Sequence, residues 1–221
     1  MTSERERELQ AVTIGKPRRA DGPIPIVDYD SAWPGLYERE AERIRGALGD
    51  RARLLEHAGS TSVPGLAAKP IIDIVLAVLD SAYEDAYVPA LEAAGYVLRI
   101  REPDWYEHRV FKGPDTDVNL HVFSEGCEEI VRMLAFRDHL RSNDADRELY
   151  ERTKRELAAR EWAFVQDYAD AKTEVVKEIV TRAGSRIEPR NGAATLRPSR
   201  GYSSAGRAPG SHPGGRRFES G

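Results

Sequence analysis

The sequence has little cysteine and no long apolar run. Cys127 is the single cysteine among 221 residues, so neither a disulfide framework nor a thiolate metal cluster can form within the chain. The longest apolar stretch, from Ile71 to Leu79, is interrupted by Asp73 and is much shorter than the roughly 18 residues of a membrane span. The N-terminus is charged and lacks the apolar stretch of a secretory signal. We therefore expect a cytoplasmic protein that does not enter a membrane.

A general excess of positive charge is also missing. The formal net charge is −4, and an arginine-rich segment over 190–221 carries +5 of it, which leaves −9 on residues 1–189. Proteins that bind nucleic acid normally present a basic face, so this acidic body argues against such a partner. A small nucleotide needs only a local nest of amides and one or two cations, and it stays compatible with the composition.

Composition divides the chain into three parts. Residues 1–22 are polar and show no clear period, which predicts a flexible leader, and residues 23–184 form the expected domain. Residues 185–221 are rich in Gly, Arg, Ser and Pro, which predicts a disordered basic tail. Arg217–Ser220 back-translates as CGG-TTC-GAA-TCC, which resembles the T-arm of a transfer-RNA gene. The tail is thus either genuine or the product of read-through into such a gene.

Hydrophobic periodicity predicts an α+β (α/β-like) domain. A mixed β-sheet of about five strands should be followed by C-terminal helices. A capping box at Ser81 and Glu84 indicates a helix that ends at Gly95. The other predicted helices cover 30–49, 130–141 and 144–183, and the predicted strands cover 51–57, 70–79, 96–100, 105–111 and 118–123.

The turn Gly59-Ser60-Thr61-Ser62 follows a strand and precedes a short helix. Glycine lets the backbone approach a ligand closely, and successive amides and hydroxyls can bind phosphate. The same residues also suit a well-capped turn without a ligand, because Ser and Thr are good N-caps.

Asp73 stands inside an otherwise apolar strand, where a carboxylate is costly unless it is paired or binds a cation. A glycine-serine turn followed by a strand aspartate brings a triphosphate and its magnesium together. Alternatively, Asp73 pairs with Lys69 or Arg109 and only orders the structure. Lys69 fits a surface lysine as well as a phosphate ligand.

Asp117, Asn119 and His121 alternate with apolar residues and so share one face of a strand. They predict either a polar floor beside Asp73 or the solvent side of an edge strand. His57, His108 and His121 have no local spacing of zinc ligands, so a metal-free role is favoured.

Two Tyr–Lys pairs, Tyr150 with Lys154 and Tyr168 with Lys172, are each four residues apart on a helix. Lysines lying over aromatic rings are ordinary packing. A functional alternative is that these cations close over an anionic ligand.

Taken together, these residues resemble the GrpB-like family of the nucleotidyltransferase superfamily. The resemblance runs from about Ile26 to Ala183 and is most specific over Glu56–Ile74. It is extended by Asn119–Phe123, Phe136–Arg141 and Tyr150 with Lys154.

The resemblance implies a polymerase-β-type nucleotidyltransferase core. In active members two carboxylates lie one residue apart and a third comes from a neighbouring strand; here Asp73 fills the first place and Val75 the second. Asp117, Asn119 or His121 would fill the third place. Because two magnesium ions need several carboxylates, Asp73 would hold one Mg²⁺ at best.

The expected function is binding of a nucleoside triphosphate or another phosphorylated molecule, with transfer of a nucleotidyl group to a small acceptor. Asp73 would hold the metal and His121, or Asp117, would act as base. The candidate phosphate ligands are Gly59, Ser60, Thr61, Ser62, Lys69, Arg109, Arg137 and Lys154.

The alternative is a non-catalytic nucleotide- or coenzyme-binding accessory domain. The resemblance implies this second function because such domains also occur behind dephospho-coenzyme A kinase domains, where they are thought to assist folding. The chain has no Gly-x-x-x-x-Gly-Lys-Ser/Thr phosphate loop of its own. A third possibility is a structural remnant without a ligand.

Overall fold

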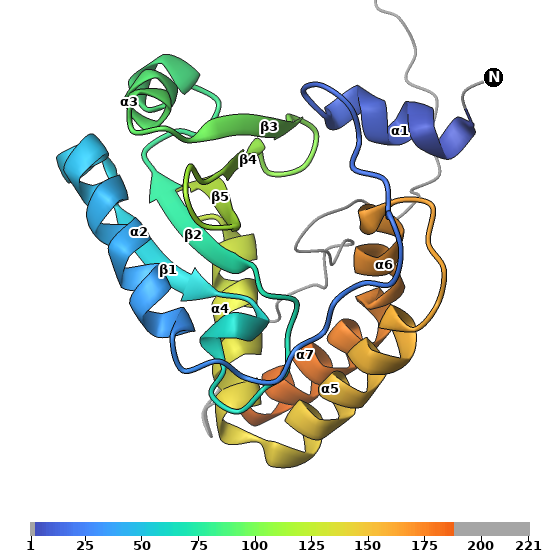
Figure 1. The fold of residues 1–221 in the computed structure, drawn as a ribbon. Helices are drawn as coiled ribbons and strands as arrows, with labels where there is room; N and C mark the ends of the chain where they lie inside the picture. The colour runs from blue at the N-terminus through green and yellow to red at the C-terminus, as the bar shows by residue number, and fades with distance from the viewer. Residues whose placement is uncertain (1–2, 188–221) are drawn as a thin grey trace, which may run out of the picture.

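A computed structural model of the chain describes residues 3–187. The predictions about the basic tail therefore fall almost wholly outside the described residues. Within them, a single mixed sheet is sandwiched between helices (Figure 1).

The sheet has five strands in the order β1-β2-β5-β4-β3. β2 and β5 are parallel and every other neighbouring pair is antiparallel. The expectation of an α+β domain with a mixed sheet and C-terminal helices is thus confirmed. The strands are β1 (Leu54–Ala58), β2 (Ile72–Val78), β3 (Val97–Glu102), β4 (His108–Lys112) and β5 (Val118–Ser124).

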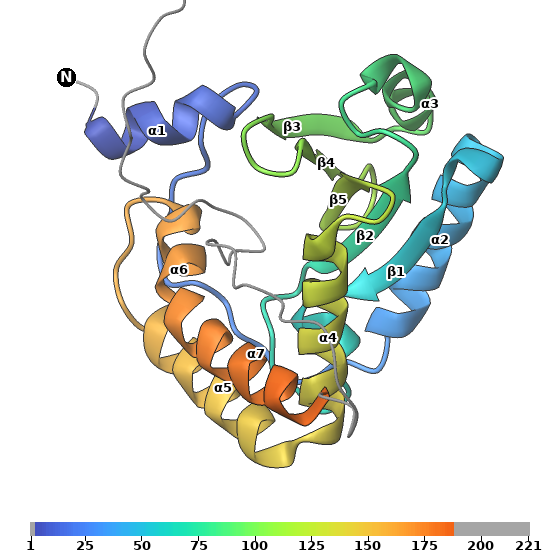
Figure 2. The same ribbon diagram turned by 180° about the vertical axis from the view of Figure 1, so that it is seen from behind.

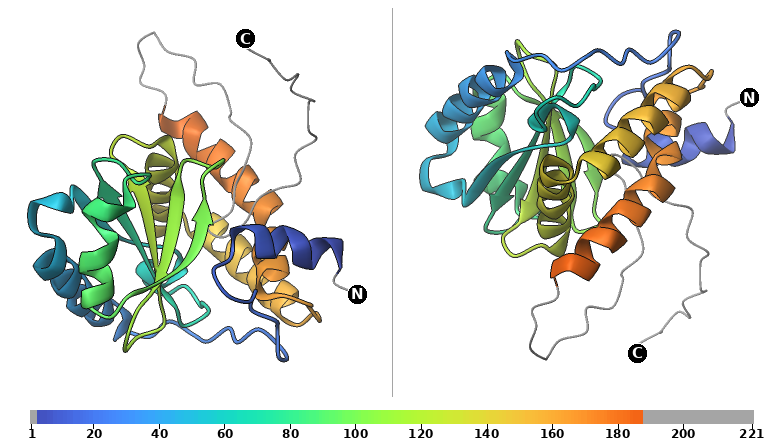
Figure 3. Two further views of the ribbon diagram at one scale, coloured as in Figure 1. Left: turned by 90° about the horizontal axis from the view of Figure 1, so that it is seen from above. Right: turned by 90° about the horizontal axis from the view of Figure 1, so that it is seen from below.

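Helices cover the two faces of the sheet unequally. α2 (Trp33–Leu48) and α3 (Val88–Ala93) lie on one face, and a larger layer of helices lies on the other (Figures 1, 2 and 3). That layer comprises α4 (Glu128–Ser142), α5 (Asp144–Ala158), α6 (Val165–Ala171) and α7 (Thr173–Ile187). None of the described helices combines the length and apolar character needed to cross a membrane.

The interior strand β2 is buried on both faces, which explains its almost continuous apolar sequence. Ile72, Ile74 and Leu76 belong to the main core beneath α2, whereas Val75 and Ala77 join a smaller cluster on the opposite face. Because side chains alternate along a strand, Asp73 points to the same face as Val75, toward the larger helical layer.

Two predicted helices differ from the observed ones. Ser81 does not cap a helix; its hydroxyl contacts the Ser124 hydroxyl at 3.0 Å, and the segment forms a 3₁₀ turn, η3 (Glu84–Ala86), before α3. The predicted long helix over 144–183 is interrupted between Ala158 and Val165, where the Trp162 indole donates to the Leu157 carbonyl oxygen at 2.9 Å. The Ser81 contact joins distant parts of the chain, whereas the Trp162 contact is local and lies just beyond the end of α5.

The leader expected to be loose contains a helix, α1 (Glu4–Val12). Its Arg5 forms ion pairs with Asp167 and Asp170 of α6, and the Ile14 amide just after it donates to the Arg99 carbonyl oxygen of β3 at 2.8 Å. α1 therefore lies between the sheet edge and α6 (Figure 1). Leu9 is its one buried residue, so the sequence offers no apolar stripe by which to predict it.

We expect Leu9→Ala to loosen α1 without unfolding the domain. Burial of this side chain contributes about 1–2 kcal/mol, so amide hydrogen exchange over residues 4–12 should accelerate about tenfold. Exchange in β2 should stay unchanged, and the exposed neighbour Arg7→Ala serves as the control. Unaltered exchange in the Leu9 variant would show that α1 is not held by this contact.

Candidate functional site

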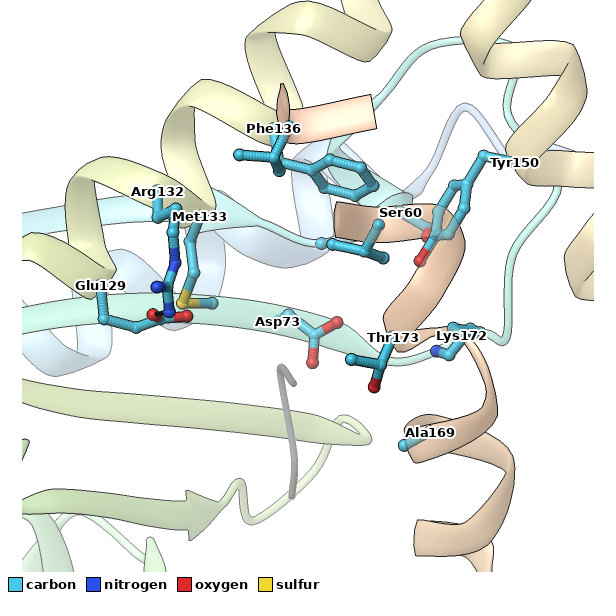
Figure 4. A pocket seen from close by; sticks show the side chains of 13 residues that line it. Ser60, Asp73, Glu129, Arg132, Met133, Phe136, Tyr150, Ala169, Lys172 and Thr173 are labelled. Atoms are coloured by element: carbon cyan, nitrogen blue, oxygen red, sulfur yellow. Dashed lines mark ion pairs between the residues drawn. The ribbon is translucent and has the colours of Figure 1, made fainter. Parts of the chain in front are cut away.

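The cleft between the sheet and the larger helical layer contains two adjoining pockets that share Ser60, Asp73, Ala169 and Lys172. The first, here the apolar pocket, holds about 710 Å³ of solvent-open space and is bordered by Met133, Phe136 and Tyr150 (Figure 4). The second, here the lysine pocket, holds about 630 Å³. Lys69, Lys154 and Lys172 line it.

Gly59 allows Asp73 to lie against the turn after β1. Its φ of +65° is a left-handed conformation that side chains disfavour. A Cβ atom on Gly59 would also lie only 2.3 Å from Asp73 Oδ2. The absence of a side chain is therefore required twice, once by the backbone and once by the carboxylate.

The three hydroxyls of the turn have different roles. Thr61 Oγ1 donates to the Ile71 carbonyl oxygen at 3.1 Å and contacts His57 Nε2 at 3.1 Å. Ser62 Oγ donates to the Gly59 carbonyl oxygen at 2.6 Å. These two residues hold the turn in shape, while Ser60 lines both pockets. Of the hydroxyls predicted to bind phosphate, that of Ser60 is the one placed to do so.

Asp73 is held in its charged form by the neighbouring strand. The Asn119 amide donates to Asp73 Oδ1 at 2.8 Å, and His121 Nε2 lies 3.6 Å from the same oxygen. Burial alone would raise the pKa of Asp73, but the His121 ring and the Asn119 amide outweigh it and hold the pKa below its usual value. No described ion pair joins Asp73 to Lys69 or Arg109, so the purely structural pairing considered from the sequence is not formed.

β5 supplies the polar floor that the sequence suggested. It lies between β2 and β4, so it is not an edge strand, and its register sets Asn119 opposite Asp73 and His121 opposite Val75. Asp117, however, precedes β5, has a side chain that is 42% exposed and pairs with Lys112 Nζ at 2.6 Å. The structure thus brings His121 to Asp73 and leaves Asp117 outside both pockets.

A buried chain of polar groups extends from Asp73 across the sheet. His121 Nδ1 contacts His108 Nε2 at 3.1 Å, and His108 Nδ1 contacts Glu102 Oε2 at 2.8 Å. The rings of His108 and His121 are stacked, with centroids 5.3 Å apart. Burial lowers the pKa of His108 to about 4, so its imidazole is neutral at pH 7.

The lysine pocket gathers cations that have no ion-pair partner among residues 3–187. Lys154 is only 2% exposed, donates to the Ala67 carbonyl oxygen and lies over the Tyr150 ring. Burial, with Lys172 nearby, lowers the pKa of Lys154 to about 7, and burial with Arg18 lowers that of Lys69 to about 8. Lys172 lies over Tyr168 in the same way as Lys154 over Tyr150.

Two predicted phosphate ligands lie elsewhere. Arg109 neighbours His108 on β4 and so faces the opposite side of the sheet, where its Nε donates to Glu84 Oε1 at 2.6 Å. Arg137 of α4 is engaged by Glu56 at 2.8 Å and by the His57 carbonyl oxygen at 2.9 Å. Both guanidinium groups are occupied by the protein itself.

The residues present do not fit a site for two magnesium ions. Across residues 3–187, no group of three His, Cys, Asp or Glu side chains is arranged to hold a metal. Glu129, a second acid at the apolar pocket, pairs with Arg132. The site therefore offers Asp73 as the carboxylate for a single cation.

Sequence reasoning missed Glu102 as a member of the site and did not commit to Lys172 or His108. The spacing of Tyr168 and Lys172 was the available signal for Lys172, and packing explains that spacing equally well. Glu102 carried no signal, because its contact with His108 depends on the pairing of β3 with β4.

Comparison with known proteins identifies the family. The sequence profile described as "GrpB protein" matches residues 23–182. The chain belongs to the GrpB family. The UPF0157 protein of Halalkalibacterium halodurans is 60% identical over 184 residues, which cover 83% of this chain and 94% of that protein. The UPF0157 protein of Streptomyces coelicolor is 47% identical over 84% of this chain and 98% of its own length.

Other relatives extend the comparison. A crystal structure of the conserved protein GrpB from Enterococcus faecalis superposes with a TM-score of 0.64 at 32% identity, covering 73% of this chain and 98% of that one. A dephospho-CoA kinase of Mycolicibacterium paratuberculosis is 28% identical over 74% of this chain, which corresponds to 47% of the kinase. Sequences similar to this chain thus make up almost the whole of some proteins and about half of a longer one.

We expect Gly59→Ala to destabilise the fold more than Gly65→Ala. Both glycines have positive φ, which costs about 1–2 kcal/mol for alanine. Nothing lies within 4 Å of a Cβ at Gly65, whereas one at Gly59 would collide with Asp73. Chemical denaturation should show an additional loss of about 1–3 kcal/mol for Gly59→Ala. That extra loss should shrink in an Asp73→Ala background; an equal loss for both alanine variants would disprove the contact.

Burial of Lys154 should make the stability of the protein depend on pH. Its pKa is about 7 in the folded state against a normal value of 10.5, so between these values the unfolded chain binds more protons and stability rises with pH. Below pH 7 the cost of burying the charge is present in full. Relative to the wild type, Lys154→Met should therefore be at its most stable below pH 7 and lose that advantage as the pH rises toward 10.5. Thermal unfolding at several pH values tests this, with the exposed Lys177→Met expected to show no such trend.

Proposed function

We propose that this GrpB protein binds a phosphorylated small molecule in the cleft, and that a nucleoside triphosphate is the ligand that fits best. The phosphates would occupy the lysine pocket. The observation that supports this most strongly is the set of three lysines, Lys69, Lys154 and Lys172, that line one pocket without an ion-pair partner among the described residues.

Electrostatics favours an anion in this pocket. Lys172 contributes to lowering the pKa of both Lys69 and Lys154, which is the effect of like charges that repel each other. A bound phosphate would reverse that repulsion and compensate for the burial of Lys154. Phosphate oxygens accept several hydrogen bonds at once, and Ser60 adds a donor at the junction with the apolar pocket.

The apolar pocket would hold the organic part of the ligand. Phe136 and Tyr150 provide aromatic surfaces and Met133 an adaptable one, which suits a planar base. Asp73 lines both pockets, and Figure 4 shows its carboxylate among the residues of the apolar pocket. A cation held by Asp73 would neutralise charge on the phosphates there.

Nucleotidyl transfer is the second candidate function, and its support is the ionised Asp73 beside His121. Val75 occupies the position of a second acid, so binding without turnover is the function that this geometry favours. The dephospho-CoA kinase relative makes coenzyme A a further ligand to test. We place this activity in the cytoplasm, where such ligands are plentiful.

Thermal unfolding with added ligands tests the proposal. We expect nucleoside triphosphates to raise Tm by several degrees, and Lys172→Met or Lys154→Met to remove most of that shift, because each removes one cation from the pocket. Lys177→Met is the matched control, since Lys177 lies on α7 and pairs with Glu174 at 2.7 Å. Its ligand-induced shift should equal that of the wild type.

The remaining outcomes separate the candidates. A shift that requires Mg²⁺ and disappears in Asp73→Asn would support transfer, and labelled nucleotide should then appear on an acceptor. A shift that needs no metal and survives Asp73→Asn would support a binding module. Absence of any shift with triphosphates, inorganic triphosphate and coenzyme A would rule out the proposal.

A further inference from the structure

We infer that His121 and Asp73 together form a binding site for a divalent transition-metal ion of the Zn²⁺ type, in preference to Mg²⁺. The inference deepens the proposed function and rests on it for the ligand that would share the cation. The protein itself contributes two donor atoms, His121 Nε2 and Asp73 Oδ1, which lie 3.6 Å apart.

The first observation is an orphaned nitrogen. His121 is 1% exposed, and its Nε2 has no hydrogen-bond partner within residues 3–187. At 3.6 Å, Asp73 Oδ1 is too far away to make a normal hydrogen bond. A buried polar atom of this kind, aimed at a carboxylate that lines the cleft, needs an explanation.

The polar chain behind His121 fixes which nitrogen carries its proton. A carboxylate can only accept a hydrogen bond, so His108 Nδ1 donates to Glu102 Oε2 at 2.8 Å. His108 Nε2 is then an acceptor, and His121 Nδ1 donates to it at 3.1 Å. In this arrangement His121 Nδ1 is occupied by His108, and Nε2 is the ring nitrogen that faces Asp73 Oδ1.

A cation between Nε2 and Asp73 Oδ1 would give the orphaned nitrogen a partner and share the charge of the carboxylate. Metal-bound histidines characteristically donate their other ring N–H to a carboxylate or another acceptor, as His121 does toward His108. Zinc binds imidazole nitrogen and carboxylate oxygen at roughly 2.0–2.2 Å, so two donors of one ion can be up to about 4 Å apart. The observed 3.6 Å falls within that limit.

The donor set determines the class of ion. Imidazole suits zinc and its neighbours in the first transition row, whereas magnesium favours oxygen ligands and water. With two protein donors, the other positions are left for water or for phosphate oxygens from the adjoining lysine pocket. Asn119 would not compete, because its amide donates to Asp73 and its oxygen accepts from Lys112 at 2.8 Å.

Metal titration of the full-length, chelator-treated protein tests this inference. Co²⁺ is the spectroscopic probe, and Zn²⁺ and Mg²⁺ are compared by calorimetry. We expect visible Co²⁺ absorption bands that Zn²⁺ abolishes, and Zn²⁺ affinity at least about 100-fold above that for Mg²⁺. His121→Phe, which preserves the stacked ring, should weaken Zn²⁺ binding at least tenfold, and His108→Phe about tenfold because it releases the orientation of His121.

The matched control is His139→Phe. His139 is also buried, but its Nε2 contacts Asp146 at 2.7 Å in the contact between α4 and α5. This variant should bind Zn²⁺ as the wild type does, which separates the site from adventitious histidine binding. Circular dichroism confirms folding, and if His121→Phe does not fold, Asp73→Asn supplies the same test through the other ligand.

Three results would overturn the inference: no Zn²⁺ binding, Zn²⁺ binding unchanged in a folded His121→Phe or Asp73→Asn, or Mg²⁺ competing at equal concentration. The second result would place the ion at other residues, and the third would show that oxygen donors rather than the His121 imidazole select the ion. These titrations contain no phosphate, and the triphosphate experiment contains no transition metal. Failure of one proposal is therefore distinguishable from failure of the other.

Discussion

Asp73 places a negative charge inside the sheet, where burial of a carboxylate is unfavourable. Several neighbouring residues of the cleft offset that unfavourable free energy. Because Gly59 has no side chain, the carboxylate can lie against the turn. On the other side Asn119 donates to it, and Lys112 in turn holds the Asn119 oxygen. The network joins β2, β4 and β5, so the position of one carboxylate is fixed by several strands together. Such a network specifies a unique arrangement when all its members are satisfied.

The two layers of the cleft contribute complementary chemistry. The sheet supplies a carboxylate and an imidazole, which are ligands for a cation, and the helical layer supplies ammonium groups at Lys154 and Lys172, which attract an anion. A phosphorylated molecule accompanied by a cation would satisfy both layers at once. Neither layer alone contains the whole site, because Lys154 lies on α5 and Lys172 lies between α6 and α7, both after the last strand.

The sequence predicts the strands and the order of elements well, because β2 is almost uniformly apolar. Gly59, Ser60 and Asp73 lie close together in the sequence, so their place at the turn and the start of β2 could be predicted as well. It also placed Asn119 and His121 correctly, since alternation settles which residues of one strand share a face. Alternation does not say which face meets the cleft, and for this reason Arg109 was assigned to the wrong side.

The prediction that Arg137 binds phosphate was wrong for another reason. Its partner Glu56 lies 81 residues away, so no local sequence pattern indicates the ion pair. α1 is held by Leu9 and by ion pairs with α6, so it has no pattern to detect.

The parallel pairing of β2 with β5 has a consequence for the time at which the protein is made. β1 can pair with β2 as soon as both have left the ribosome, but the other edge of β2 must wait until Ser124 has been added. At about 5–20 residues per second this takes roughly 2–10 seconds, during which an apolar strand edge is open to incorrect pairing. The carboxylate of Asp73 on that strand makes the waiting edge less apolar. Asp73, whose burial is unfavourable in the folded protein, can thus reduce aggregation of the partly synthesised chain.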